Sequence, residues 1–217
     1  MKAMVEPEAI KITRLFTTPV ASIIHPLAHS LNPQLLEIIR ERMEKDPGSR
    51  HSNQGGWQST GDFNEWGGIQ GRELHDFASK AASELTAVHS QEFGLSEAQF
   101  PWTSNSWANV NLAGQSNSVH GHAGAFWSAV YWVDDGGRHE DPSIGGDLSF
   151  IDPRGLMPSV YNPSLRMKVE GCVSAGCNAS FAATSGMLLL FPSWLMHSVE
   201  LFSGHRPRVS IAFNFGL

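Results

Sequence analysis

The sequence predicts an α+β protein, mainly β, in which helices from the N-terminal half support a sandwich or barrel of strands. Two observations lead to this prediction. Apolar residues recur with helical spacing before residue 90, whereas from Ser104 onward they alternate with a period of two. Turns rich in Gly, Pro and Asp separate the alternating segments, as is typical of many short strands. Helices that precede a run of strands favour segregated layers over alternating β-α units.

The N-terminal hundred residues are expected to contain one strand and two helices. Ile10–Phe16 is a candidate first strand. Asn32 followed by Pro33 has the pattern of a helix N-cap with proline at the first helical position, and this helix should end before Pro47. A second helix is predicted over Leu74–Val88, where apolar residues and alanines keep the i, i+3, i+4 spacing. Its alanine face suits close packing against a sheet.

Two stretches lack a clear period. Residues 48–71 are rich in Gly, Ser and Asn, but Trp57 and Trp66 indicate that this stretch packs on something. Residues 153–186 are rich in Pro, Asn, Gly and Ser, and a loop of that length is more often a lid or binding loop than a plain connection.

The C-terminal half is expected to form the β core. Six segments have the alternation or the apolar content of strands: Ser106–Leu112, Phe126–Val133, Asp147–Ile151, Met187–Phe191, His197–Phe202 and Arg208–Phe215.

The composition excludes several classes of protein. With 41% hydrophobic and 17% charged residues, the 217-residue chain can bury a full core, and we expect one domain over residues 1–217, with helical support in 1–100 and the β core in 101–217. The net charge of −6 attracts neither nucleic acid nor anionic lipid, and no apolar run is long enough to span a membrane. Cys172 and Cys177 are too few for a disulfide framework, so we expect reduced thiols and a cytoplasmic location.

Three of the ten histidines form a candidate metal site. His120 and His122 are two residues apart, and in an extended strand both imidazoles would point to one face. A third ligand would then come from a neighbouring strand. His197 follows an apolar segment and begins a predicted strand, which makes it the best candidate. Imidazole is the commonest metal ligand in proteins.

Arg208 and Ser210 form a candidate carboxylate-binding pair. They share one face of the last predicted strand, while Val209 and Ile211 line the other face. We expect the turn at Ser203-Gly204 to make a hairpin that places His197 opposite Ser210. A guanidinium and a hydroxyl close to a metal ligand are well suited to bind a carboxylate.

Together, these segments resemble the Fe(II)/2-oxoglutarate-dependent oxygenases, and more narrowly a bacterial branch of that superfamily. The resemblance runs from residue 55 to the C-terminus. Its segments are Gly55–Ser59, Trp107–Asn111, His120–His122, Ser128–Val133, the residues Gly145–Phe150, Phe191–His197 and Arg208–Asn214.

The resemblance implies a double-stranded β-helix, or jelly-roll barrel, and a hydroxylase-type dioxygenase that uses Fe(II) and 2-oxoglutarate. It implies His120 and His197 as iron ligands and Arg208 with Ser210 as the site of the 2-oxoglutarate carboxylate. Where the family usually has Asp or Glu, this chain has His122, which either is the third ligand or lies beside a two-His site. Asn109, Asn111 and Tyr131 are further candidates for hydrogen bonds to the co-substrate or the substrate. The substrate, a small molecule or a peptide, and the oligomeric state cannot be inferred.

Two other functions are compatible with parts of this pattern. A cupin-like or three-His metalloenzyme would hold zinc or iron without using 2-oxoglutarate, but the glutamate of the cupin motif is missing after His122. A non-catalytic jelly-roll protein could bind sugars or similar ligands on its seven tryptophans, but the three histidines and Arg208 then have no role.

Overall fold

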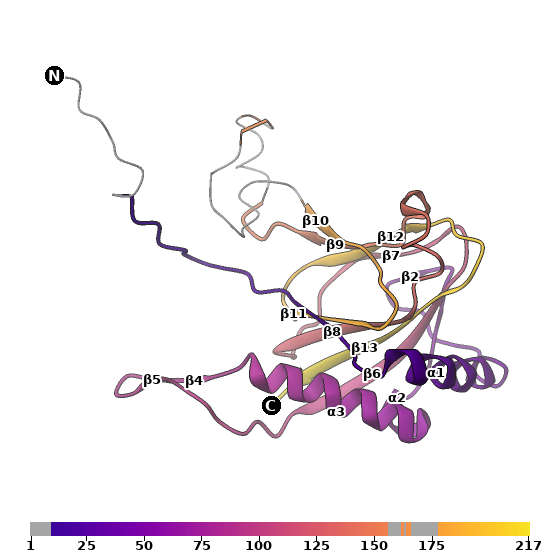
Figure 1. Cartoon of the computed structure of the whole chain (residues 1–217), viewed down its shortest axis with the longest axis horizontal. Helices are drawn as coiled ribbons and strands as arrows, with labels where there is room; N and C mark the ends of the chain where they lie inside the picture. The colour runs from indigo at the N-terminus through magenta and orange to yellow at the C-terminus, as the bar shows by residue number, and fades with distance from the viewer. Residues whose placement is uncertain (1–9, 156–161, 163, 166–177) are drawn as a thin grey trace.

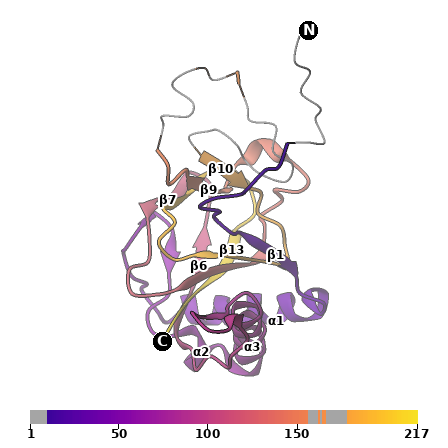
Figure 2. The ribbon, with the colours of Figure 1, turned by 90° about the vertical axis from the view of Figure 1, so that its left-hand side faces the viewer.

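The computed structural model describes residues 10–155, 162, 164–165 and 178–217, and it contains two antiparallel sheets that face each other (Figure 1). The larger sheet has the strand order β1-β11-β8-β13-β6-β3, and the smaller sheet has the order β10-β9-β12-β7-β2. Three helices lie against the outer face of the larger sheet (Figure 2). A separate two-stranded hairpin, β4-β5, projects from the body of the protein.

The helices are α1 (Ala28–Met43), α2 (Phe63–Trp66) and α3 (Gly68–Glu84), with a 3-10 turn at Pro142–Ile144. The strands of the larger sheet are β1 (Ala21–Ile24), β3 (Trp57–Gln58), β6 (Thr103–Asn111), β8 (Trp127–Asp134), β11 (Met187–Pro192) and β13 (Arg208–Gly216). Those of the smaller sheet are β2 (Asn53–Gln54), β7 (Gln115–His120), β9 (Leu148–Ile151), β10 (Asn178–Phe181) and β12 (His197–Phe202), and the hairpin consists of β4 (Val88–Ser90) and β5 (Gly94–Ser96).

Successive strands of the C-terminal half pass from one sheet to the other, except β9 and β10, which pair within the smaller sheet. Strands β6, β8, β11 and β13 belong to the larger sheet, and β7, β9, β10 and β12 belong to the smaller one. Within the described residues, no strand pairing joins the two sheets, so the expected sandwich or barrel is present as two facing sheets and not as a closed barrel. The chain is therefore mainly β with few helices, as the change of period at Ser104 predicts.

Strand β13 lies inside the larger sheet, paired with β6 on one side and β8 on the other, and it separates two environments. Ile211, Phe213 and Phe215 are fully buried in the apolar core beneath the helices. Arg208 and Ser210 point the other way, into the space between the sheets. The alternation expected from the sequence is thus present, and it places the guanidinium of Arg208 and the hydroxyl of Ser210 between the two sheets.

Two apolar clusters hold the layers together. The first lies between the helices and the larger sheet, where α3 contributes Leu74, Ala78 and Ala82, each with no exposed surface. The second fills part of the space between the sheets and is centred on Trp132 and Phe191. Burial of this apolar surface is the main force that fixes the sheets face to face.

The first strand and the first helix differ from the prediction. Ile10–Phe16 forms no strand, and its apolar side chains are exposed; β1 lies later in the chain and pairs with β11. Helix α1 begins at Ala28, with Leu27 rather than Asn32 at its N-cap. The Asn32 side chain is engaged elsewhere: it donates to the carbonyl of Val133 at 2.8 Å and accepts the Tyr131 hydroxyl at 2.6 Å.

The second helix is shifted toward the N-terminus relative to the prediction. It spans Gly68–Glu84 instead of Leu74–Val88, and Val88 instead begins β4, which pairs with β5. The polar stretch 48–71 contains β2, β3 and α2. Its two tryptophans pack as expected: the Trp57 indole donates to the carbonyl of Asp46 at 3.0 Å, and Trp66 contacts Phe63 edge to face.

Two expectations about the C-terminal half need correction. The predicted hairpin at Ser203-Gly204 is wrong, because β12 and β13 lie in different sheets and do not pair with each other. The long unpatterned stretch also contains the strand β10, which pairs with β9. Most of the remainder of that stretch, with Cys172 and Cys177, lies outside the described residues. Within the part of the chain that the structure describes, no helix is long and apolar enough to span a membrane.

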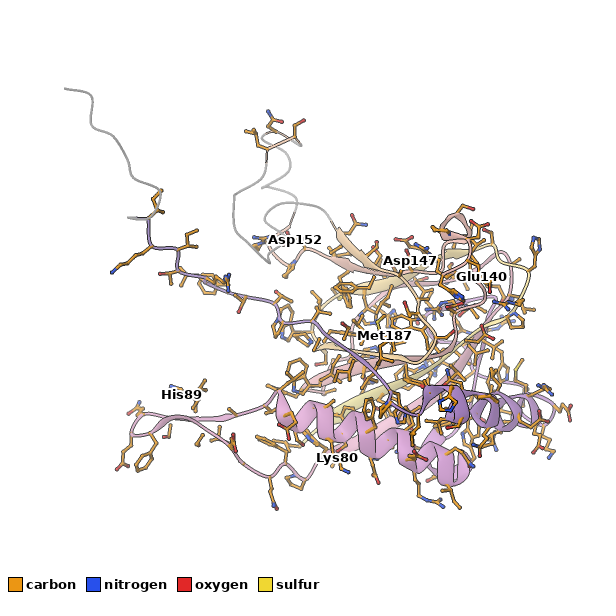
Figure 3. All side chains as sticks on the ribbon, viewed as in Figure 1. Lys80, His89, Glu140, Asp147, Asp152 and Met187 are labelled. Carbon is orange, nitrogen blue, oxygen red and sulfur yellow. The ribbon has the colours of Figure 1, made fainter. Side chains whose placement is uncertain are left out.

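The packing of α3 gives a stability prediction. Ala82→Glu should lower the free energy of unfolding by about 2–5 kcal/mol, because it places an unpaired carboxylate in the core beneath the sheet. Lys80→Glu is the matched control, since Lys80 is exposed on the same helix and points away from the sheets (Figure 3). Chemical denaturation of both variants measures the difference. Equal stability of the two variants would show that Ala82 is not packed as described.

Candidate metal centre

Three histidines converge at one end of the space between the sheets. His120 is the last residue of β7 and lies directly across from His197, the first residue of β12. His122 follows β7 by two residues. One ligand nitrogen from each ring lies within 4.8 Å of the other two, and the ring centroids are 4.4–5.2 Å apart. The structure thus brings together all three histidines predicted from the sequence.

His122 reaches this cluster from a loop rather than from an extended strand. Its backbone N–H donates to the carbonyl of Ser193 at 3.0 Å, and the Ser193 N–H donates to Phe126 at 3.1 Å. The Ser193 hydroxyl also donates to the carbonyl of Ala125. These bonds fasten the loop after β7 to the turn before His197. The expected same-face strand geometry of positions 120 and 122 is therefore replaced by a loop that a neighbouring turn holds in place.

Backbone carbonyls orient two of the rings. The Nδ1 atom of His120 is 2.8 Å from the carbonyl of Ser118, and that of His197 is 2.8 Å from the carbonyl of Leu195. A carbonyl can only accept a hydrogen bond, so this network assigns the proton to Nδ1 in both rings. The Nε2 lone pairs are then free to bind a metal, in the arrangement that usually fixes metal-binding histidines.

Burial keeps two of the three rings in the form that binds metals. The pKa of His197 falls to about 3, mainly through burial; the hydrogen bond to Leu195 opposes this shift, and the charges of His120 and His122 add to it. The pKa of His122 falls to about 4, mainly through burial and then through the charge of His120. Both rings are neutral at pH 7, and a neutral imidazole is the metal ligand.

A cavity between the sheets connects the histidines with Arg208. Only 1% of Arg208 is exposed, and among the described residues its side chain makes a single, long hydrogen bond of 3.4 Å, from Nη1 to Oδ1 of Asn111. Its Nε and Nη2 atoms have no hydrogen-bond partner in the described part of the chain. The guanidinium carbon lies 5.9 Å from the centroid of the Trp132 ring. Burial lowers the pKa of Arg208 to about 10 and Asp147 opposes this, so Arg208 is charged at neutral pH.

The other predicted residues divide into two groups. Ser210 and Asn109 are cross-strand partners on β13 and β6, and both line the cavity. Tyr131 does not line it. This residue lies in the core beneath the helices, on the opposite face of β8, where its hydroxyl donates to Asn32. That placement differs from the expectation that Tyr131 bonds to the co-substrate, because its side chain faces away from the cavity.

Sequence reasoning missed two polar residues of the cavity, Ser52 and Asn117. The Asn117 amide donates to the Ser52 hydroxyl at 3.2 Å, and that hydroxyl lies 3.5 Å from Nε2 of His120. Ser52 precedes β2, which pairs with β7. The only signal in the sequence was the pair of tryptophans in residues 48–71, which indicated packing but not what the stretch packs against.

The comparison with protein families agrees with this geometry. Residues 105–214, 110 of the chain's 217, match the family described as "Putative 2OG-Fe(II) oxygenase". The chain belongs to this 2OG-Fe(II) oxygenase family. It is an Fe(II)- and 2-oxoglutarate-dependent dioxygenase, and this membership decides against the cupin-like enzyme and the non-catalytic binder. The resemblance inferred from the sequence is confirmed.

Solved structures show the same fold at low sequence identity. A prolyl-4-hydroxylase from Pseudomonas putida is 17% identical, with a TM-score of 0.56 over 92% of this chain and 93% of that one. A prolyl hydroxylase from Trichoplax adhaerens, in complex with a hypoxia inducible factor peptide, is 12% identical with a TM-score of 0.59 over 91% and 83%. HygX from Streptomyces hygroscopicus, with nickel and 2-oxoglutarate bound, is 12% identical with a TM-score of 0.55 over 92% and 83%. No curated protein matches the chain.

The three-His cluster gives a prediction of metal content. Purified protein loaded with Fe(II) or another first-row divalent ion should hold one ion per chain, and the double variant His120→Ala/His197→Ala should hold almost none. His89→Ala is the control, because His89 is exposed on the projecting hairpin (Figure 3). Elemental analysis after desalting measures the occupancy. A fully occupied double variant would place the metal elsewhere.

Proposed function

We propose that His120, His122 and His197 hold the Fe(II) ion and that Arg208 with Ser210 binds the distal carboxylate of 2-oxoglutarate. The observation that carries this proposal is the buried guanidinium of Arg208, whose Nε and Nη2 atoms lack a partner among the described residues. A buried charge without a hydrogen-bond partner is costly. A dicarboxylate that bridges the histidines and Arg208 would give each end of the cavity the partner it lacks.

The donor set fits Fe(II). Imidazole nitrogen is a common ligand of iron, and three rings that each bring one nitrogen to the same cluster can occupy one side of the ion. The usual triad of the family carries a carboxylate, and here His122 stands in that position. The centre of this protein therefore has one negative charge less than the usual triad. When bound, Fe(II) and 2-oxoglutarate supply activation of molecular oxygen for oxidation of the substrate.

The opposite end of the cavity fits a carboxylate. The planar guanidinium can donate two parallel hydrogen bonds to both oxygens, which an ammonium group cannot do. The Ser210 hydroxyl and the Asn109 amide lie on the same face of the larger sheet and can donate to the same ligand. Among the described residues that line the cavity, none carries a carboxylate that would repel a dianion.

The remaining walls hold the two ends apart and exclude water. Leu148, Phe191 and Val199 provide apolar surface beside the polar groups. In this low-dielectric setting, the charge-assisted bonds of Arg208 are stronger than they would be at the protein surface. Trp107 lies against His122 with ring centroids 5.6 Å apart and fixes the outer side of that ring. These residues bind and orient the co-substrate, and the metal supplies the chemistry when it is bound.

We further propose that the fold is a double-stranded β-helix and that the enzyme is a hydroxylase. The eight strands β6–β13 divide four and four between the facing sheets and change sheet at each step except from β9 to β10, as in a jelly roll, and the solved structures support the assignment. A peptide or a small molecule is the proposed substrate: the Trichoplax protein is seen with a peptide, and HygX is seen with hygromycin B. A cytoplasmic location is proposed from the low cysteine content.

The role of Arg208 is tested by titration of 2-oxoglutarate into the metal-loaded protein under anaerobic conditions. Arg208→Lys should weaken binding about tenfold or more, because a point charge cannot reproduce the paired hydrogen bonds. Arg208→Ala should nearly abolish binding but leave the metal content unchanged, since Arg208 is not a ligand. Isothermal calorimetry, or the absorbance of the Fe(II) complex, measures the affinity.

Arg206→Ala is the control for this series, because Arg206 lies two residues away but is exposed and paired with Glu140. It should bind 2-oxoglutarate as the wild type does. If metal-loaded wild type fails to bind 2-oxoglutarate, the proposed function is wrong. If Arg208→Ala binds as tightly as the wild type, the carboxylate lies elsewhere in the cavity.

A further inference from the structure

Strand β9 is preceded by a segment that contacts Arg208. Gly146 lies so close to Arg208 that a Cβ atom on it would be 3.1 Å from Cδ and 3.4 Å from Nε of the arginine. Gly146 also has a φ of +80°, a backbone conformation that other residues rarely adopt. The next residue, Asp147, is 8% exposed. Its negative charge raises the pKa of Arg208, in opposition to the lowering by burial.

The carboxylate of Asp147 is nevertheless bonded to another arginine. Arg138 donates from Nε to Oδ1 at 2.7 Å and from Nη2 to Oδ2 at 2.8 Å, so both carboxylate oxygens are engaged. The two side chains are only 15% and 12% exposed, which reduces screening by water. Among the described residues, no hydrogen bond joins Asp147 to Arg208, so Asp147 acts on Arg208 through its charge, while Nε and Nη2 of Arg208 stay unpartnered.

We propose that Arg138 and Asp147 are positioning residues that set the affinity of the enzyme for 2-oxoglutarate, with Arg138 restraining Asp147 from pairing with Arg208. This inference rests on the proposed function, because it assigns Arg208 to the co-substrate. Asp147 supplies the negative charge that a buried guanidinium needs when no co-substrate is bound. Arg138 engages both oxygens of that carboxylate, so that the hydrogen bonds of the Arg208 guanidinium remain free for the incoming dicarboxylate.

The proposal predicts opposite effects for the two halves of one ion pair. Asp147→Asn removes the charge that competes with the co-substrate, so 2-oxoglutarate should bind about threefold tighter or more. Arg138→Met frees the Asp147 carboxylate to pair with Arg208, so binding should weaken by about threefold or more. Arg138→Lys restores a cation beside Asp147 and should return the affinity most of the way to that of the wild type. A merely structural pair would move the affinity in the same direction for both single variants.

The experiment is calorimetric titration of 2-oxoglutarate into the Co(II)-loaded full chain, with metal content and melting temperature measured for each variant. Glu140→Gln is the charge-matched control: it also removes one negative charge from this part of the protein, but Glu140 is exposed and paired with Arg206 (Figure 3). Glu140→Gln should bind as the wild type does. The asparagine variant is isosteric with aspartate, so a folded protein is expected, and the two Arg138 variants test the proposal independently.

Opposite shifts for Asp147→Asn and Arg138→Met, with recovery in Arg138→Lys, support the proposal. Shifts in the same direction, or affinities equal to that of the wild type, overturn it. An equal shift in Glu140→Gln overturns it as well, since net charge alone would then explain the effect. Absence of binding in the wild type would instead contradict the proposed function, so the two failures can be told apart.

Discussion

The burial of one positive charge is the constraint on which the co-substrate end of the cavity depends. Arg208 is 1% exposed and lies between two sheets, away from bulk solvent. The aliphatic part of its side chain packs closely against Gly146, and its guanidinium lies near the Trp132 ring. The negative charge of Asp147, which does not line the cavity, partly balances its positive charge. None of these contacts satisfies Nε or Nη2. The fold thus maintains an unsatisfied donor pair that is suited to a carboxylate, which is preorganisation for binding.

The histidine cluster depends on pairing within the smaller sheet and on one turn. His120 and His197 meet because β7 and β12 are neighbours with these two residues in register. His122 joins them because Ser193, four residues before His197, holds the loop after β7 by its backbone and its hydroxyl. Two separate constraints therefore place three ligands, and neither involves Arg208. This independence is why loss of the guanidinium is expected to leave the metal site intact.

The sequence could predict what periodicity and residue type determine. The alternation of β13 put Arg208 and Ser210 on one face, and the spacing of the histidines indicated a metal site. Pairing between distant segments could not be predicted in this way: the supposed hairpin after His197 was wrong because β12 and β13 lie in opposite sheets. Strands β12 and β13 still face each other, but from opposite sheets of the sandwich and not as hydrogen-bonded neighbours in one sheet. The prediction for Tyr131 failed for a related reason, because no local feature of the sequence indicates that its hydroxyl bonds to Asn32.

A crystal structure of the full chain with a divalent metal and 2-oxoglutarate tests the central claim most directly. The account predicts Nε2 of His120 and His197, together with a nitrogen of His122, bound to the metal. It also predicts the distal carboxylate within hydrogen-bond distance of Nε or Nη2 of Arg208. A metal held by other residues, or a co-substrate carboxylate that leaves the Arg208 guanidinium without a partner, would contradict it.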